Sequence, residues 1–151
     1  MPAIRAFAIN CTLKPSPEQS NTDSLLEIVL GGLQKEGVEV EATRAVDHEI
    51  KPGVESDMGE GDEWPPDPGE DRLVRDPGDR HADLAGQAVD IGFTVPGQSW
   101  TYWNMGPGPG PSFLETDEGH DWSRTTAEAA AQNLLSVARA LQASPVPPPP
   151  R

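Results

Sequence analysis

The chain of 151 residues is poor in cysteine, in basic residues and in long apolar runs. Its single cysteine, Cys11, excludes an internal disulfide and a zinc site built on several thiolates. No stretch approaches the roughly 20 apolar residues of a membrane-spanning helix, so we expect no membrane segment. Residues 1–9 contain no apolar run long enough for a secretory signal. The expected location is therefore the cytoplasm.

Basic residues are outnumbered, with 11 Lys and Arg against 25 Asp and Glu, and the net charge is -14 at pH 7. Such a charge repels nucleic acids and anionic membranes, so neither is an expected partner. Hydrophobic residues make up only 35% of the chain, while Pro and Gly number 17 and 15. This composition predicts that part of the chain lies outside a packed core.

The N-terminal part, residues 1–54, has the pattern of a strand, a helix and a second strand. Residues 4–9 are apolar apart from one arginine, which predicts a strand covered on both faces of a parallel sheet. Residues 38–42 alternate between apolar and polar side chains and predict the second strand. Two parallel strands joined through a helix form a right-handed unit, and this half of the chain is predicted to do so.

The connection between the first strand and the helix is a candidate anion site. Residues 12–19 contain two prolines and are predicted to form a loop. Ser20 predicts a helix N-cap, with Asp23 three residues later in the manner of a capping box, and Gly37 predicts the end of the helix. The first backbone N–H groups of a helix lack partners inside it, and the helix dipole favours an anion there.

Side chains of the same loop supply further donors for a phosphate, namely Thr12, Lys14, Ser20 and Thr22. The loop contains neither the G-K-[ST] of a Walker loop nor the G-x-G-x-x-G of a dinucleotide site. An ordinary surface loop between a strand and a helix is also rich in Ser, Thr, Pro and Lys. The spacing alone leaves both interpretations open.

The middle of the chain, residues 55–83, changes in character. It contains eleven acidic residues and three arginines, which give it a net charge of -8. Pro and Gly recur, and D-P-G-E-D-R at 67–72 is echoed by D-P-G-D-R at 76–80. Apolar residues are too scattered for a strand or an amphipathic helix. We therefore predict an acidic, Pro/Gly-rich loop or a disordered segment.

The C-terminal half, residues 84–142, is predicted to fold again, and residues 143–151 are predicted to form a disordered, proline-rich tail. The predicted elements are, in chain order, a short helix over 84–91, a strand over 93–95, an aromatic-rich stretch over 99–104, a Gly/Pro loop over 106–111 and a helix over 126–142.

Two features of this half carry specific expectations. Thr125 and Glu128 have the spacing of a capping box for the last helix. Its predicted buried stripe consists of Ala127, Ala130, Leu134, Ala138 and Leu141. The aromatic side chains within 100–103 suit either the flanks of a planar ligand or ordinary packing and a dimer face. The three histidines show no metal-ligand spacing, and solvated loop histidines are the expected outcome.

Several blocks of sequence resemble one family. The segment N-C-T-L-K-P-S-P-E-Q-S-N-T-D-S-L-L at 10–26 resembles the first loop of the NAD(P)H-dependent FMN reductase branch of the flavodoxin-like family. D-I-G-F-T-V-P at 90–96, W-T-Y-W-N at 100–104 and E-T-D-E-G-H-D-W-S at 115–123 resemble blocks of the same family. The resemblance implies an α/β fold with a flavodoxin-like, three-layer parallel sheet, FMN as cofactor and NAD(P)H as electron donor.

The resemblance also implies a set of binding residues for the flavin phosphate, which are Thr12, Lys14, Ser20, Asn21 and Thr22. It implies no catalytic side chain, because the flavin carries the hydride chemistry. A homodimer is a further implication, since reductases of this type commonly pair.

The chain departs from the family in its middle. Family members have five parallel strands in the order 2-1-3-4-5, whereas only residues 65–81 stand where strands three and four belong. The predicted sheet is therefore incomplete. Two functions follow, an FMN-binding NAD(P)H-dependent oxidoreductase or a non-catalytic, truncated remnant of that family that binds no flavin.

Overall fold

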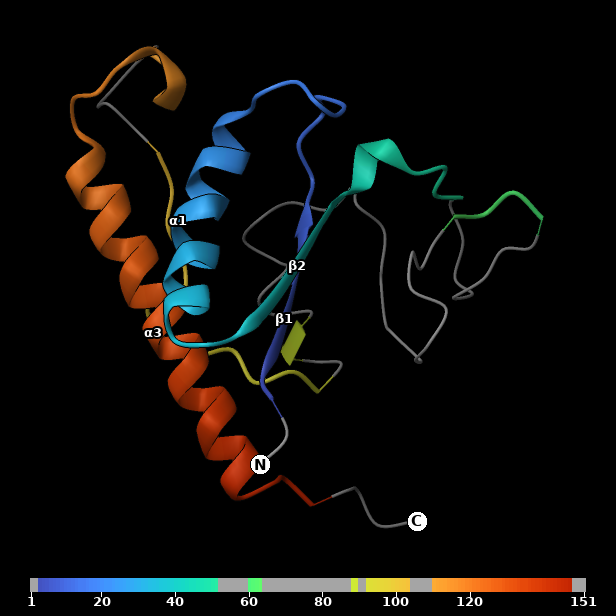
Figure 1. Cartoon of the computed structure of the whole chain (residues 1–151), viewed down its shortest axis with the longest axis vertical. Helices are drawn as coiled ribbons and strands as arrows, with labels where there is room; N and C mark the ends of the chain where they lie inside the picture. Colours follow the sequence, from blue (N-terminus) through green and yellow to red (C-terminus); the bar gives the residue numbers. More distant parts are fainter. Residues whose placement is uncertain (1–2, 52–59, 64–87, 90–91, 104–109, 148–151) are drawn as a thin grey trace.

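The computed structural model describes residues 3–51, 60–63, 88–89, 92–103 and 110–147. Figure 1 shows the two long helices side by side, with the two strands next to them. The elements are, in chain order, β1 (Arg5–Asn10), α1 (Asn21–Lys35), β2 (Glu39–Arg44), the 3-10 turns η1 (Ala45–Asp47) and η2 (Phe113–Glu115), and α3 (His120–Ala143).

The N-terminal half forms the predicted βαβ unit. β1 and β2 pair in parallel, in a register that runs from Arg5 opposite Glu39 to Asn10 opposite Arg44. Within the described residues the sheet has these two strands alone. The predicted fold class is thus confirmed as α/β and flavodoxin-like but incomplete, with strands three and four missing from the part that the structure describes.

The two ends of α1 are set by local interactions of residues that the sequence analysis identified. Ser20 has an extended backbone, and its Oγ accepts a hydrogen bond from the backbone N–H of Asp23 at 3.1 Å. The Asp23 carboxylate in turn accepts from the Ser20 hydroxyl at 2.7 Å. At the other end Gly37 has a φ of 80°, a left-handed conformation that glycine adopts without a steric penalty. Both predicted ends of the helix are confirmed.

The core lies between the two helices and one face of the sheet. Leu33, Val38, Ala131 and Leu135 are each less than a tenth exposed and pack into one cluster. Partly buried side chains complete it from α1 and the sheet, namely Ile4, Ala6, Val29 and Val40.

The opposite face of the sheet is open, and the prediction of a strand covered on both faces is wrong. Phe7 and Ile9 are 38% and 42% exposed. Because side chains alternate along a strand, these two point away from the helices that cover Ala6. An apolar run is typical of a strand that is covered on both faces of its sheet. The run does not indicate whether the second covering layer is present.

The predicted third strand over 93–95 is also wrong, because these residues have no strand partner among the described residues. The preceding Gly92 has a φ of 98°, and its N–H donates to the carbonyl oxygen of Val89 at 3.0 Å, so the chain turns here instead of extending. Most of the predicted helix over 84–91 lies outside the described residues, as do most of the Gly/Pro loop over 106–111 and most of the segment 55–83.

The last helix starts earlier than predicted. α3 begins at His120, and Thr125 and Glu128 lie inside it, so the predicted capping box is wrong. The N-cap position is occupied by Gly119 in a left-handed conformation, with no capping side chain. The acidic Asp121 in the first turn favours this start through the helix dipole.

The buried stripe of α3 is partly as predicted. Ala127 and Ala130 are buried, but Leu134 is 39% exposed while Leu135 is 5% exposed. The small residues of this stripe let α3 approach α1 closely, because the Cβ that Gly32 lacks would lie 3.1 Å from the Cβ of Ala131.

This close approach predicts different outcomes for two adjacent glycines of α1. Gly31→Ala places a methyl group where nothing lies within 4 Å, so the better helix propensity of Ala should raise the free energy of unfolding by about 0.5–1 kcal/mol. Gly32→Ala should lose that gain, since its methyl group meets Ala131. Thermal and urea unfolding of the two variants measures the difference, and equal stabilisation would show that the helices do not pack this closely.

Candidate functional site

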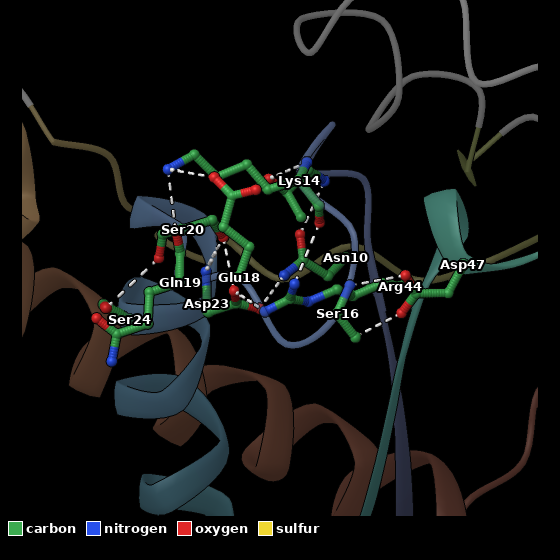
Figure 2. Close-up of polar contacts among 11 residues, drawn as sticks. Asn10, Lys14, Ser16, Glu18, Gln19, Ser20, Asp23, Ser24, Arg44 and Asp47 are labelled. Atoms are coloured by element: carbon green, nitrogen blue, oxygen red, sulfur yellow. Dashed lines mark hydrogen bonds and ion pairs between the residues drawn. The ribbon is translucent and has the colours of Figure 1, made fainter.

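The candidate site lies at the carboxyl edge of the sheet, where β1 leads through a loop into α1. Because the two strands are parallel, their carboxyl ends lie side by side, and Asn10 stands opposite Arg44. Figure 2 shows that side chains from the loop, from the first turn of α1 and from the end of β2 converge here. Ligands of open α/β sheets bind at this edge.

Asn10 shapes the start of the loop. The residue is only 3% exposed, and its Oδ1 accepts a hydrogen bond from the backbone N–H of Thr12 at 2.9 Å. Its Nδ2 donates to the carboxylate of Asp23. One buried amide therefore fixes the loop to the first turn of the helix.

An ion pair connects the three segments of the site. The guanidinium of Arg44 contacts the carboxylate of Asp23, and these side chains are 15% and 23% exposed. The same guanidinium donates to the carbonyl oxygen of Lys14 at 3.1 Å. Arg44 thus holds the loop, the helix and the second strand together.

A second contact secures the middle of the loop. The backbone N–H and the hydroxyl of Ser16 donate to the Asp47 carboxylate at 2.9 Å and 2.5 Å. These bonds stabilise the charged carboxylate and lower the pKa of Asp47, with smaller contributions from the charges of Arg44 and His48.

Among the predicted phosphate ligands, three precede the helix, and each contacts other protein groups. The Thr12 Oγ1 accepts from the backbone N–H of Lys14 at 3.3 Å, which leaves the hydroxyl hydrogen of Thr12 free to donate. The Lys14 ammonium contacts Glu18 at 3.3 Å and donates to the carbonyl oxygen of Gln19 at 3.0 Å. Ser20 is the helix cap, and its hydroxyl donates to Asp23.

The other two, Asn21 and Thr22, are the first residues of α1. The Asn21 Oδ1 accepts from the backbone N–H of Leu114 at 3.3 Å, which brings η2 against the start of the helix. The backbone N–H groups of Asn21 and Thr22 have no acceptor among the described residues, as expected for the first turn of a helix. The structure therefore gathers all five predicted residues around one helix start.

Two ion pairs lie within the site. Glu18 and Asp23 neutralise the two cations, Lys14 and Arg44. The free donors are consequently backbone N–H groups and a hydroxyl, with the helix dipole behind them. The nearby Glu115 has a pKa lowered by hydrogen bonds from the backbone and side chain of Ser112, with a small contribution from the charge of Lys14.

The sequence interpretation missed Asn10, Arg44 and Asp47. A signal was present, because Asn10 and Arg44 are polar residues that follow closely after the two predicted strands, and such positions meet at one edge of a parallel sheet. Cys11 is exposed, and no group of three potential metal ligands occurs within the residues that the structure describes. A cavity of about 440 Å³ near Gly32 and Arg139 lies towards the other end of α1 and is not part of this site.

Comparison with known proteins gives partial matches. No known family model matches the chain. Over 72 residues it is 33% identical to 8-demethyl-8-aminoriboflavin-5'-phosphate synthase of Streptomyces davaonensis, covering 42% of this chain and 28% of that protein. Over 66 residues it is 52% identical to the divalent metal cation transporter MntH of Mycobacterium bovis, covering 41% of this chain and 10% of that protein. The chain thus spans less than a third of either relative.

One solved structure shares the fold over most of the chain. The crystal structure of RosB with bound 8-demethyl-8-formylriboflavin-5'-phosphate superposes with a TM-score of 0.74 and 22% identity, covering 95% of this chain and 82% of that one. At this identity the likeness shows the fold alone. Across the described ranges, no helix is both long and apolar enough to cross a membrane.

The ion pair at the site predicts unequal effects for two arginines. Arg44→Ala should lower the free energy of unfolding by about 1–3 kcal/mol, because it leaves the partly buried Asp23 carboxylate without its cation. Arg139→Ala is the matched control. Arg139 contacts Glu36 at 3.3 Å with both side chains more than half exposed, so its loss should cost less than about 0.5 kcal/mol. Urea unfolding compares the two, and equal losses would contradict a special role for Arg44.

The lowered pKa of Asp47 predicts a pH effect of defined sign. A carboxyl group whose pKa is lower in the folded state stabilises the fold above its unfolded-state value, about 3.9, and this stabilisation disappears as pH falls through the folded value. The stability advantage of the wild type over Asp47→Asn should therefore shrink below about pH 4. Urea unfolding from pH 7 to pH 3 measures it, with Glu27→Gln on the exposed face of α1 as control. An advantage that is independent of pH would refute the role of the Asp47 charge.

Proposed function

We propose that this chain is an FMN-binding, NAD(P)H-dependent oxidoreductase that holds the flavin phosphate at the start of α1. The observation that carries the proposal is the pair of N–H groups of Asn21 and Thr22, which have no acceptor in the described part of the chain and lie at the carboxyl edge of a parallel βαβ unit. Such a helix start is a favourable place for a phosphate. The two flavin-related proteins named above, one similar in sequence and one in fold, are both named with a riboflavin 5'-phosphate.

The residues present fit a phosphate group. The Thr12 hydroxyl and the N–H groups of Asn21 and Thr22 are the free donors. Lys14 supplies a cation at little cost, because its pair with Glu18 is about half exposed and such pairs contribute little. Ser20 acts through the cap, which keeps the first turn of α1 in place.

When bound, the isoalloxazine ring of FMN supplies the hydride chemistry, and NAD(P)H is the proposed electron donor. The described residues contribute binding and orientation, so no catalytic side chain is proposed. The exposed pair Phe7 and Ile9 gives a second copy an apolar surface to cover, which favours a homodimer. With one cysteine in the chain, the cytoplasm is the proposed compartment.

A second candidate is favoured by the same open face. Phe7 and Ile9 are apolar side chains of a sheet whose second covering layer is absent from the described residues. A truncated remnant that folds but binds no flavin would expose the same two apolar side chains on this face of the sheet. The loop at the start of α1 does not depend on the missing covering layer, so its presence is compatible with both candidates. A measurement of flavin binding distinguishes them.

The loop predicts that the phosphate contributes to binding. FMN should bind at least about ten-fold more tightly than riboflavin, which lacks the phosphate, because only FMN reaches the helix start. Thr12→Val should weaken the binding of FMN and leave the binding of riboflavin unchanged. Flavin fluorescence quenching and a shift in thermal unfolding temperature measure both ligands.

The matched control is Thr116→Val. The Thr116 Oγ1 accepts from the backbone N–H of Glu118 at 3.0 Å, which is the same local bond that Thr12 forms with Lys14, but Thr116 lies outside the loop. Cooperative unfolding that FMN does not shift would favour the remnant and refute the flavoprotein. Bleaching of bound FMN by NADH or NADPH under anaerobic conditions then tests the proposed electron donor.

A further inference from the structure

An aromatic cavity lies on the side of α3 that is turned away from α1. It has a volume of about 310 Å³ and is lined by Gln98, Trp100, Trp122, Thr125, Thr126 and Ala129. Ala129 lies about 200° around the helix from Ala131, which packs against Gly32 of α1. The cavity is therefore separate from the loop at the start of α1, and its role is independent of the proposed function.

The walls of the cavity are held in place by a set of hydrogen bonds. The Asn133 side chain donates to the carbonyl oxygen of Gly97 at 2.9 Å. The Thr101 hydroxyl donates to the carbonyl oxygen of Ser123 at 3.1 Å, and the Ser123 hydroxyl donates to that of Tyr102 at 2.8 Å. The segment that carries the aromatic side chains is thus fixed to α3 at three points, and the cavity is formed before any ligand arrives.

Gln98 lies at the rim with a φ of 52°, a left-handed conformation that is uncommon outside glycine. Residues in this region are found at ligand sites where the surrounding contacts enforce them. The Asn133 side chain supplies such a contact, since it also donates to the carbonyl oxygen of Gln98 at 3.4 Å. The side-chain amide of Gln98 has no partner among the described residues, and neither has the hydroxyl of Thr125.

Three aromatic rings define what the cavity accepts. Trp100 stacks on Tyr102 with ring centroids 5.4 Å apart and an interplanar angle of 8°. Trp122 lies against both rings, at 6.3 Å and 4.5 Å. Rings in mutual contact leave no space for a cation between them, which excludes an aromatic cage. Tyr102 does not line the cavity, so the exposed indoles of Trp100 and Trp122 remain as surfaces for a flat ring.

We propose that this cavity binds a small, planar, uncharged heteroaromatic ring that carries an amide-like edge. The ring stacks on the indole of Trp100, with the inclined indole of Trp122 at its side. Its edge meets the side-chain amide of Gln98 and the hydroxyl of Thr125, which have no partner among the described residues. The volume suits a compact ligand. The described residues that line the cavity include no cation that would hold an anion, and the net charge of -14 lowers the attraction for an anion at long range.

The probe that tests the proposal is 2-quinolinone, a planar lactam, with its fully saturated bicyclic lactam as control. Both present the same N–H and C=O edge, but only the first is flat. Titration of the full chain is followed by the indole N–H signals in ¹⁵N-correlated spectra. The planar lactam should shift the signals of Trp100 and Trp122 saturably and bind at least about ten-fold more tightly than its saturated analogue.

Variants assign the binding to the cavity. Trp100→Leu should weaken binding of the planar lactam by about ten-fold. The nearly isosteric Thr125→Val should weaken it by about three-fold or more, and this second variant tests the proposal if the first unfolds. Trp103→Phe is the control, since Trp103 packs at the edge of Phe113 and lies outside the cavity. Equal binding of the two lactams, or binding that survives both cavity variants, would overturn the proposal. Dimerisation through Trp100 that excludes the lactam would replace it with a contact between copies.

Discussion

The contact between Arg44 and Asp23 is the interaction on which the candidate site depends. It joins the end of β2 to the first turn of α1, and through the carbonyl oxygen of Lys14 it also holds the loop between them. Asn10 reaches the same carboxylate from the end of β1. The end of β1, the N-cap of α1 and the end of β2 thus share one partly buried carboxylate, and the helix start acquires a fixed position relative to the sheet edge.

The rest of the fold is organised on one side of the sheet. Helices α1 and α3 cover one face closely, with Gly32 and Ala131 allowing the approach, while Phe7 and Ile9 remain exposed on the other face. The covered face and the loop belong to the same βαβ unit. A site at the start of α1 therefore needs only the layer that the structure describes, whereas the walls of a complete flavin pocket would need the other layer as well.

The features that could be predicted from the sequence are those set by interactions between neighbouring residues. The Ser20 cap and the turn at Gly37 depend on neighbouring residues, and both were predicted. The start of α3 was not, because Gly119 caps it without a side chain, while Thr125 has the pattern of a cap and lies inside the helix. The role of Arg44 depends on strand register, which brings residues 34 positions apart to one edge. The five predicted loop residues lie together because all fall within residues 12–22, on one loop and the start of one helix. Four of them were selected for their donor groups, and Asn21 was added by the resemblance.

The charge balance of the loop explains how a chain of net charge -14 can offer an anion site at all. A general excess of acid lowers the attraction for any anion at long range. At the loop, however, Glu18 and Asp23 are paired with Lys14 and Arg44, so these two carboxylates are compensated where an arriving phosphate meets the oriented N–H groups. The N–H groups act over hydrogen-bond distances, whereas the charges of the distant acidic residues are screened by salt. Binding at such a site would depend on fit to the helix start more than on net charge, and a phosphate attached to a flat, partly buried ring would gain over a free phosphate ion.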